Sequence, residues 1–482
     1  MNLLFVASEC APFIKTGGLA DVIGAVPKAL AARGLGVKIL LPAYRGLSGV
    51  TIGGAEVMAF DDLFGGPARV LETRARGLDL LLLDAPHLYD RGGSIYLGPD
   101  GRDWPDNDLR FAALSCAAAQ VALEGVGGWR PDVVNAHDWQ AGLVPVYLAQ
   151  DGRRAPPVVM TIHNIAFQGL FEAERLAKLR LTKAMFTPEG VEYFGRIGFL
   201  KAGLALSDRI TTVSPSYAAE LLTPKFGMGL EGLLQKRQGE LSGILNGIDT
   251  EAWDPETDPA LVAPYSVRSL RGKARNKAEV ERRFGLDPEA GPLFCVISRL
   301  TAQKGLDMLL DRLPHLVGKG GRLALLGTGD AALERAFAAA ANRYRGRVGA
   351  IIGYDEDLSH LVQAGSDAIL IPSRFEPCGL TQLYGLRYGT LPVVARTGGL
   401  ADTVIDANEA ALLADCATGL QFAPVSAPLL GHAISRACAL YAQPKRWRAM
   451  MRRAMRHPVG WDLSAEAYLE VYRAALDGAG AA

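Results

Sequence analysis

Short apolar runs alternate with amphipathic helical patterns along nearly all of the 482 residues. Runs such as residues 3–7 and Leu293–Ile297 have the length and the continuous apolar character of strands that are buried on both faces. In the segments between them, for example residues 19–33, apolar side chains recur every three to four positions, which predicts helices. This alternation predicts parallel sheets covered by helices on both faces, an α/β fold.

The predicted strands form two series, and a chain of this length exceeds one ordinary core. The first series is residues 3–7, 37–41, 78–83, 132–135, 158–162, 209–213 and 243–245. The second series is residues 293–297, 322–326, 350–352, 368–371 and 392–395. A boundary is expected near Asn246, followed by a loop-rich connection at 253–275 and a helix from about Asn276. We therefore predict domains at 1–245 and 246–460.

Composition narrows the class of protein. Lys plus Arg and Asp plus Glu both number 51, so no broad charge favours nucleic acid or an anionic membrane as partner. The six cysteines are scattered without a C-x-x-C pair, which indicates neither a zinc site nor a disulfide framework. The first residues resemble a strand rather than a signal peptide, and no apolar run reaches transmembrane length. A cytoplasmic protein is expected.

The most informative motif is the decapeptide at 373–382, between a predicted strand and a predicted helix at 380–388. Free backbone N–H groups at a helix start suit phosphate. The carboxylate of Glu376 would repel phosphate, so we assign it to sugar hydroxyls, although a charge at a helix terminus would be an ordinary alternative. Phosphate beside sugar indicates a sugar nucleotide.

Other polar groups also follow predicted strands. Lys15 precedes Gly17 and Gly18 in a turn that suits phosphate but matches neither the dinucleotide nor the Walker pattern, and a plain Gly-rich turn is equally compatible with it. Arg299 and Lys304 follow another strand and suit a diphosphate, or else form a solvated pair at a turn.

Two further constellations lie in the first half of the chain. Asp138 and Trp139 could bind a sugar, although a helix cap by Asp138 with Trp139 in the core is favoured locally. His163 follows another predicted strand, where a histidine could stabilise charge but is more often structural. Asp138 and His163 also invite comparison with a Ser-His-Asp hydrolase, but the chain has no G-x-S-x-G elbow.

Taken together, these motifs resemble the bacterial branch of the glycogen/starch synthase family of retaining glycosyltransferases. The resemblance runs from residue 2 to about 472 and rests on Lys15–Val22, His137–Trp139, His163–Asn164, Asn246–Asp249, Arg299 with Lys304, and Glu376–Gln382. It implies a GT-B architecture, with two Rossmann-like doubly wound parallel-sheet domains facing across a cleft, and a last helix at 461–482 that returns to the first domain. It also implies transfer of glucose from ADP-glucose to an α-1,4-glucan such as glycogen, without metal or other cofactor.

The resemblance further implies roles for individual residues. The catalytic set is Glu376, His163, Arg299 and Lys304; donor binding falls to Lys15, Gly18, Asn246, Tyr354, Cys378, Gly379, Leu380 and Thr381; acceptor binding falls to Glu9, Asp138 and Trp139. Tyr384 stands where the wider clan often has a second glutamate, which puts a base-recognition role there in doubt. A UDP-glucose-dependent synthase, a pyridoxal-phosphate-dependent phosphorylase and a non-catalytic glucan-binding protein are the alternatives.

Overall fold

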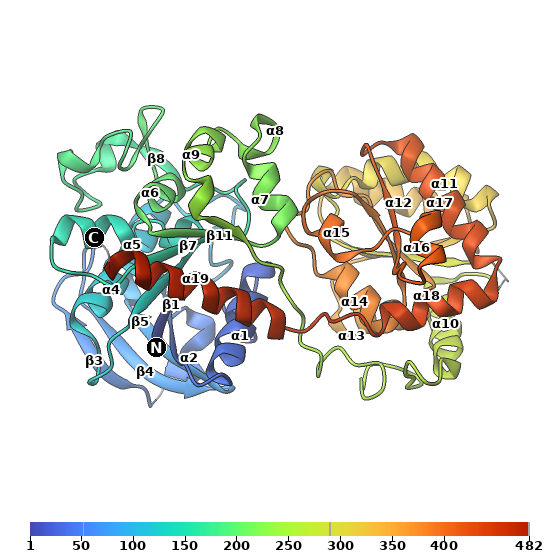
Figure 1. Ribbon diagram of the computed structural model, residues 1–482, viewed down its shortest axis with the longest axis horizontal. Helices are drawn as coiled ribbons and strands as arrows, with labels where there is room; N and C mark the ends of the chain where they lie inside the picture. Colours follow the sequence, from blue (N-terminus) through green and yellow to red (C-terminus); the bar gives the residue numbers. More distant parts are fainter. Residues whose placement is uncertain (52, 289–290, 481–482) are drawn as a thin grey trace. The chain divides into compact units, whose positions relative to one another are not determined.

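The computed structural model describes residues 1–51, 53–288 and 291–480. The chain divides into two compact units (Figure 1). The first unit contains Met1–Val213, Ala218–Ile244 and Trp461–Ala482, and the second contains Ser214–Tyr217 and Leu245–Gly460. Both are α/β, as predicted from the alternating pattern.

The first unit is built on a nine-stranded sheet in the order β12-β11-β7-β6-β1-β2-β5-β4-β3. Seven strands, from β12 to β5, run parallel, whereas β4 and β3 add an antiparallel edge. The bounds are β1 Asn2–Val6, β2 Gly36–Pro42, β3 Ala55–Phe60, β4 Ala68–Ala75, β5 Leu78–Asp84, β6 Val133–His137, β7 Val158–Ile162, β11 Arg209–Thr212 and β12 Leu241–Gly243. A small antiparallel sheet, β8-β10-β9, consists of β8 Leu170–Glu172, β9 Glu192–Tyr193 and β10 Arg196–Gly198.

Helices cover this sheet. The connection β1-α1-β2 moves across it in one direction and β5-α4-β6 in the other, so right-handed crossovers place α1 and α4 on opposite faces. The last helix, α19 (Asp462–Gly480), packs beside α1 and contacts β6 and β7 (Figure 1). The other helices are α1 Gly18–Ala31, α2 Ser48–Thr51, α3 Pro86–Tyr89, α4 Asn107–Glu124, α5 Val144–Asp151, α6 Phe199–Leu206, α8 Pro224–Gly227 and α9 Glu231–Lys236, with α7 (Pro215–Leu221) divided between the two residue ranges.

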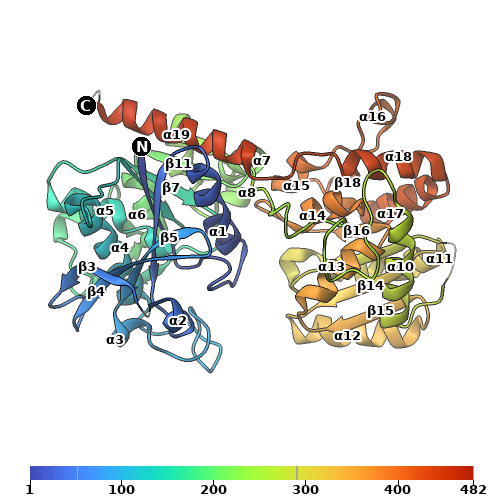
Figure 2. The same cartoon turned by 90° about the horizontal axis from the view of Figure 1, so that it is seen from below.

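The second unit has a six-stranded parallel sheet in the order β15-β14-β13-β16-β17-β18 (Figure 2). Successive residues of one strand enter two separate cores: Phe294 and Val296 of β13 join one, while Leu293 and Cys295 join the other. This alternation shows why the strands are apolar throughout, because both faces are buried. The bounds are β13 Leu293–Ile297, β14 Arg322–Gly327, β15 Val348–Ile352, β16 Ala368–Ile371, β17 Leu391–Ala395 and β18 Leu420–Phe422.

The helices of the second unit fall into packed groups. Helix α10 packs against α13. Helix α17 packs against both α11 and α18. Their bounds are α10 Arg271–Phe284, α11 Leu306–Gly318, α12 Ala331–Arg343, α13 Glu356–Gly365, α14 Thr381–Tyr388, α15 Gly398–Thr403, α16 Glu409–Leu413, α17 Ala427–Tyr441 and α18 Pro444–Ala454.

The helix predicted from about Asn276 begins earlier, at Arg271, so that part of the sequence prediction was wrong. The first turn is fixed by tertiary packing: a Cβ at Gly272 would lie 2.1 Å from the carbonyl oxygen of Pro264. The buried Lys273 ammonium also donates hydrogen bonds to the carbonyl of Ala364 and the hydroxyl of Thr390. These long-range contacts leave no mark on local periodicity.

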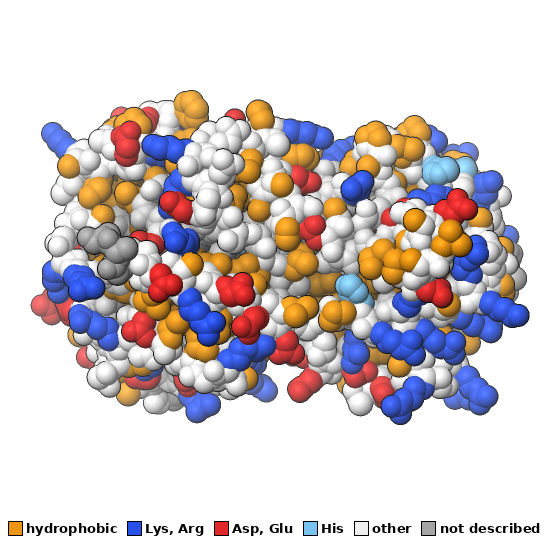
Figure 3. Space-filling view, in the orientation of Figure 1, with side chains coloured by type: hydrophobic (Ala, Val, Ile, Leu, Met, Phe, Trp, Pro, Cys, Tyr) orange, Lys and Arg blue, Asp and Glu red, His pale blue; other side chains and the backbone are white. Residues whose placement is uncertain are grey.

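On the face shown in Figure 3, acidic and basic side chains of the first unit are interspersed. Within the described ranges, no helix is long and apolar enough to span a membrane. The same residues contain no group of three or more His, Cys, Asp or Glu side chains arranged to hold a metal ion.

Candidate active site

In the second unit, three of the predicted catalytic residues follow two neighbouring strands at the point where the strand order reverses. From β13 the chain continues to β14 on one side, whereas β16 on the other side continues to β17. Such a reversal leaves a crevice beyond the carboxyl ends of the strands, where α/β proteins bind ligands. Arg299 and Lys304 follow β13, and Glu376 follows β16.

Lys304 and Glu376 contact one another directly. The Lys304 Nζ lies 2.9 Å from Oε1 and 2.7 Å from Oε2 of Glu376, and the Ser373 hydroxyl donates to Oε2 at 2.8 Å. The carboxylate is buried, and its ion pair with the ammonium offsets part of the cost of burying both groups. The two residues assigned by sequence to phosphate and to sugar therefore form one charge-paired unit at the switch point.

The loops that carry this pair are held by close backbone contacts. A Cβ at Gly305 would lie 2.0 Å from the carbonyl oxygen of Pro372, and one at Gly398 would lie 2.0 Å from that of Glu376. Gly305 and Gly398 also have positive φ angles of 66° and 43°. Arg374, in the loop after β16, adds a bidentate ion pair to Asp307 in the first turn of α11, at 2.7 and 2.6 Å. The glycines are needed here because the protein backbone itself approaches closely.

Asn246 lies beside the start of α14. Its side chain is buried, and its Oδ1 has no hydrogen-bond partner among the residues that the structure describes. The backbone N–H of Asn246 interacts with the Cys378 thiol, whose pKa is raised to about 12 by burial, so that thiol is neutral. Gly379, Leu380 and Thr381 follow and lead into the helix. A buried oxygen without a partner marks a position where a ligand group can donate a hydrogen bond.

Arg299 and Tyr354 differ from the other site candidates of the second unit in being exposed. Tyr354, after β15, is 72% exposed, and the Arg299 guanidinium makes no ion pair within the described part of the chain. Both lie at carboxyl ends of the sheet, so a cation and an aromatic ring are available there to a ligand.

In the first unit, the Gly-rich turn is organised around Glu9. This buried carboxylate accepts hydrogen bonds from the Thr16 N–H at 2.5 Å, the Thr16 hydroxyl at 2.7 Å, the Gly17 N–H at 3.1 Å and the Tyr96 hydroxyl at 2.6 Å. Lys15 pairs with Asp21 at 2.7 Å. Glu9, predicted to bind acceptor, thus accepts hydrogen bonds from the turn itself, and the N–H groups of Thr16 and Gly17 are already bonded to it.

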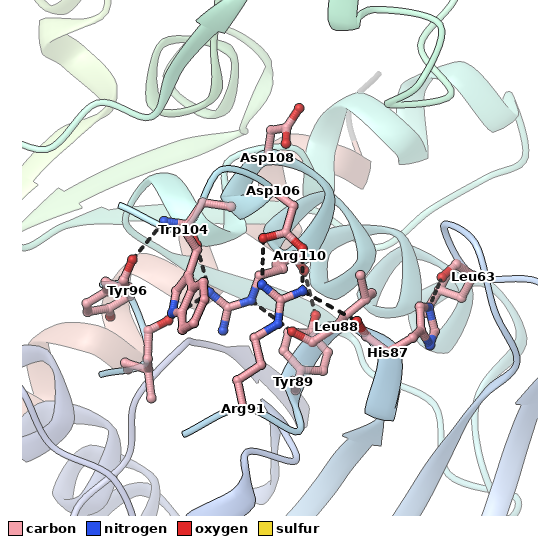
Figure 4. A network of polar contacts seen from close by, with 12 residues as sticks. Leu63, His87, Leu88, Tyr89, Arg91, Tyr96, Trp104, Asp106, Asp108 and Arg110 are labelled. Carbon is pink, nitrogen blue, oxygen red and sulfur yellow. Dashed lines mark hydrogen bonds and ion pairs between the residues drawn. The ribbon is translucent and has the colours of Figure 1, made fainter. Parts of the chain in front are cut away.

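Sequence reasoning missed Tyr96, which lies in the excursion between β5 and α4 (Figure 4). The buried Arg110 of α4 donates to the carbonyls of Leu88 and Ile95, and Asn107 donates to the carbonyl of Tyr96 at 3.0 Å. These bonds hold the excursion so that Tyr96 reaches Glu9. An arginine within an apolar helical stripe was the sequence signal available for this buried network.

At the end of β6, Asp138 adopts an unusual backbone conformation with φ of 53°. Its Oδ1 accepts from the His163 N–H at 2.7 Å, and the Asn164 N–H also bonds to the carboxylate. Burial raises the pKa of Asp138 to about 7 despite these bonds. Asp138 makes no side-chain cap to the following turn, so the helix-cap interpretation was wrong.

Trp139 is packed among aromatic rings, as the core interpretation predicted. Phe111 lies edge-on to it with ring centroids 4.9 Å apart, and Phe171 and Phe199 lie at 5.9 and 6.2 Å. A Cβ at Gly169 would lie 2.4 Å from the indole. The residue is half-buried, so part of it remains accessible.

Two α/β units, each with its polar groups beyond the carboxyl ends of parallel strands, define a glycosyltransferase of the GT-B architecture. The starch synthase catalytic domain family matches residues 2–236, and glycosyl transferases group 1 matches residues 277–453. The chain belongs to the glycogen/starch synthase family, which confirms the resemblance and the fold class predicted from sequence.

Similar proteins cover the whole chain. It is 65% identical over 479 residues to a glycogen synthase of Roseobacter denitrificans, covering 99% of this chain and 100% of the relative. It is 57% identical to a glycogen synthase of Paracoccus denitrificans, covering 98% and 99%. The solved catalytic domain of starch synthase IV from Arabidopsis thaliana, bound to ADP and acarbose, is 31% identical with a TM-score of 0.86 and 99% coverage of both chains.

Proposed function

We propose that this protein is a glycogen synthase that transfers glucose from ADP-glucose to the non-reducing end of an α-1,4-glucan, with retention of configuration. The observation that carries the proposal is the Lys304–Glu376 pair at the switch point of the second unit. A cation for a diphosphate and a carboxylate for hexose hydroxyls lie in direct contact there, as a sugar nucleotide requires. Family membership, and the ADP in the Arabidopsis relative, support the same donor class.

Donor binding is assigned mainly to the second unit, which corresponds to the predicted domain 246–460. Arg299 and Lys304 hold the diphosphate, with the backbone at Gly379, Leu380 and Thr381 assisting. Glu376 accepts hydrogen bonds from glucose hydroxyls. The Oδ1 of Asn246, which has no partner among the described residues, accepts from the donor beside Cys378. The exposed ring of Tyr354 stacks on adenine.

The first unit supplies the groups that bind the acceptor and assist the donor. The half-buried Trp139 contacts a glucan ring. Lys15 and Gly18 assist at the phosphates, and His163 lies beside the transferred glucose. We assign Glu9 and Asp138 to the acceptor side through the loops that they hold. No metal or other cofactor is assigned, and a cytoplasmic location is proposed.

In the chemical step, the bond between the anomeric carbon and the diphosphate oxygen breaks, and its electron pair leaves with ADP. The acceptor 4-hydroxyl forms the new bond from the same face, and its proton passes to the departing phosphate oxygen. Arg299 and Lys304 stabilise the negative charge that develops on the leaving group. A single carboxylate, Glu376, is assigned at the hexose, so no double-displacement carboxylate pair is invoked.

The test is a transfer assay with labelled ADP-glucose and labelled UDP-glucose, using glycogen as acceptor. The proposal expects label in glycogen and ADP release with the first donor, and much lower rates with the second. A preference for UDP-glucose would overturn the donor assignment. Absence of label from glycogen with either donor would leave a non-catalytic glucan-binding protein.

A further inference from the structure

His137 and Asp138, at the end of β6, both form hydrogen bonds with His163. The His137 Nδ1 lies 3.0 Å from His163 Nε2, and Asp138 Oδ1 lies 2.7 Å from the backbone N–H of His163. The positive φ of Asp138 turns its carboxylate onto that amide while the imidazole of His137 stays in the core, stacked on Phe5 with ring centroids 5.3 Å apart. Side chain and backbone of His163 are therefore both fixed from one strand end.

The hydrogen bond between the imidazoles decides which nitrogen of His163 carries a proton. Burial lowers the pKa of both rings, that of His163 to about 3, so both are neutral and one must donate to the other. The other nitrogen of His137, Nε2, is buried without a partner among the described residues. A buried lone pair without a donor costs less than a buried N–H without an acceptor.

The lower-energy arrangement therefore has the His137 proton on Nδ1, donated to Nε2 of His163. Because Nε2 of His163 then accepts, the single proton of its neutral ring lies on Nδ1. No hydrogen bond to this Nδ1 is formed within the described ranges, so its N–H can be donated to a ligand.

We propose that His137 is a positioning residue that holds His163 as the Nδ1–H tautomer, presenting a neutral donor to an oxygen of the transferred sugar. The inference rests on the proposed function for the role of His163, whereas the tautomer can be measured without activity. His137 itself does not touch the substrate. Its effect on catalysis passes through His163 alone.

The kinetic test replaces the donor while keeping the ring. His137→Phe retains the stack on Phe5 but removes Nδ1, and should lower kcat about 10- to 100-fold, as is usual for orienting partners, with KM changed far less. His137→Asn places an amide N–H near the former Nδ1 and should recover most of kcat. His315→Phe, at a partly buried histidine bonded to Ser435, is the matched control and should keep wild-type kcat.

A double-mutant cycle separates positioning from general stability. In a His163→Ala background, His137→Phe should cause no further fall in kcat, because its only route of action is gone. A further tenfold fall, or wild-type kcat in the single His137→Phe variant, would overturn the proposal. Thermal unfolding of each variant identifies any that fail to fold. If His137→Phe does not fold, kcat of His137→Asn is compared with that of the wild type instead.

The tautomer itself is read from long-range ¹⁵N–¹H spectra of histidine-labelled protein, which contains seven histidines. The His163→Ala variant assigns the His163 signals. Protonation of His163 on Nδ1 in the wild type supports the inference, and protonation on Nε2 refutes it. If the wild type transfers no glucose, the proposed function fails while this measurement still decides the tautomer.

Discussion

Replacing Arg299 with alanine gives the sharpest test of the leaving-group assignment. Arg299 is exposed and forms no ion pair within the described residues, so its loss should change the free energy of unfolding by no more than about 0.5 kcal/mol. Removal of one group that stabilises transition-state charge costs about 2–4 kcal/mol, or roughly 30- to 1000-fold in rate. Arg299→Ala should therefore lose activity while its free energy of unfolding stays almost unchanged.

The same substitution at Lys304 would not separate them. Its ammonium neutralises the buried Glu376 carboxylate, and breaking a buried pair by removing one partner costs about 3–5 kcal/mol of stability. Lys304→Ala should lower both the unfolding midpoint and the rate. A fall in activity in that variant alone would be ambiguous, which is why Arg299 is the better site.

The assay measures kcat/KM for ADP-glucose with saturating glycogen, alongside thermal unfolding. Arg345→Ala is the matched control, because Arg345 is also exposed but precedes β15, at the opposite end of the same sheet. The control should keep wild-type kcat/KM. If Arg299→Ala also keeps it, or loses no more than the control, the cation is not at the leaving group.

Three further outcomes are expected. Glu376→Gln should lower kcat/KM by roughly 10- to 1000-fold, because an amide cannot accept at both oxygens and leaves Lys304 unneutralised; wild-type activity would exclude the sugar-binding role. Tyr96→Phe removes a donor to the buried Glu9 carboxylate and should lower the free energy of unfolding by about 1–3 kcal/mol, measured by chemical denaturation; an unchanged value would mean that the bond contributes nothing. Asp138 has a folded pKa of about 7, above its unfolded value, so its contribution to stability is present below about pH 4 and is lost as pH rises to 7. Asp138→Asn should therefore make the unfolding midpoint temperature less dependent on pH over this range. An unchanged pH dependence would mean that other groups cause it.

Most of the two parallel sheets could be predicted from the sequence, because strands buried on both faces are continuous apolar runs. The edge strands β3 and β4 were missed for the converse reason. Residues of Ala55–Phe60 are largely exposed or half-buried, so polar side chains interrupt the apolar pattern. The short β8–β10 sheet was missed because strands of two or three residues carry no measurable period.

The candidate residues were found because each follows a predicted strand, but their contacts with one another were not. The Lys304–Glu376 pair joins residues 72 positions apart, and the Tyr96–Glu9 bond joins residues 87 apart. Local sequence patterns do not show which residues so far apart in the chain will pair. His137 was noted only as part of a motif, since a buried histidine looks the same in sequence whether it orients a neighbour or fills the core.

Glu9 gives the first unit an internal anion. Its carboxylate already occupies the N–H groups of Thr16 and Gly17, where an incoming phosphate oxygen would otherwise bind. A nucleotide therefore either displaces a side chain that belongs to the fold or uses Lys15 and the next amides along the helix. Nucleotide affinity should thus respond more strongly to changes after β13 than to changes in the Gly-rich turn, because the Glu9 carboxylate already holds the geometry of that turn.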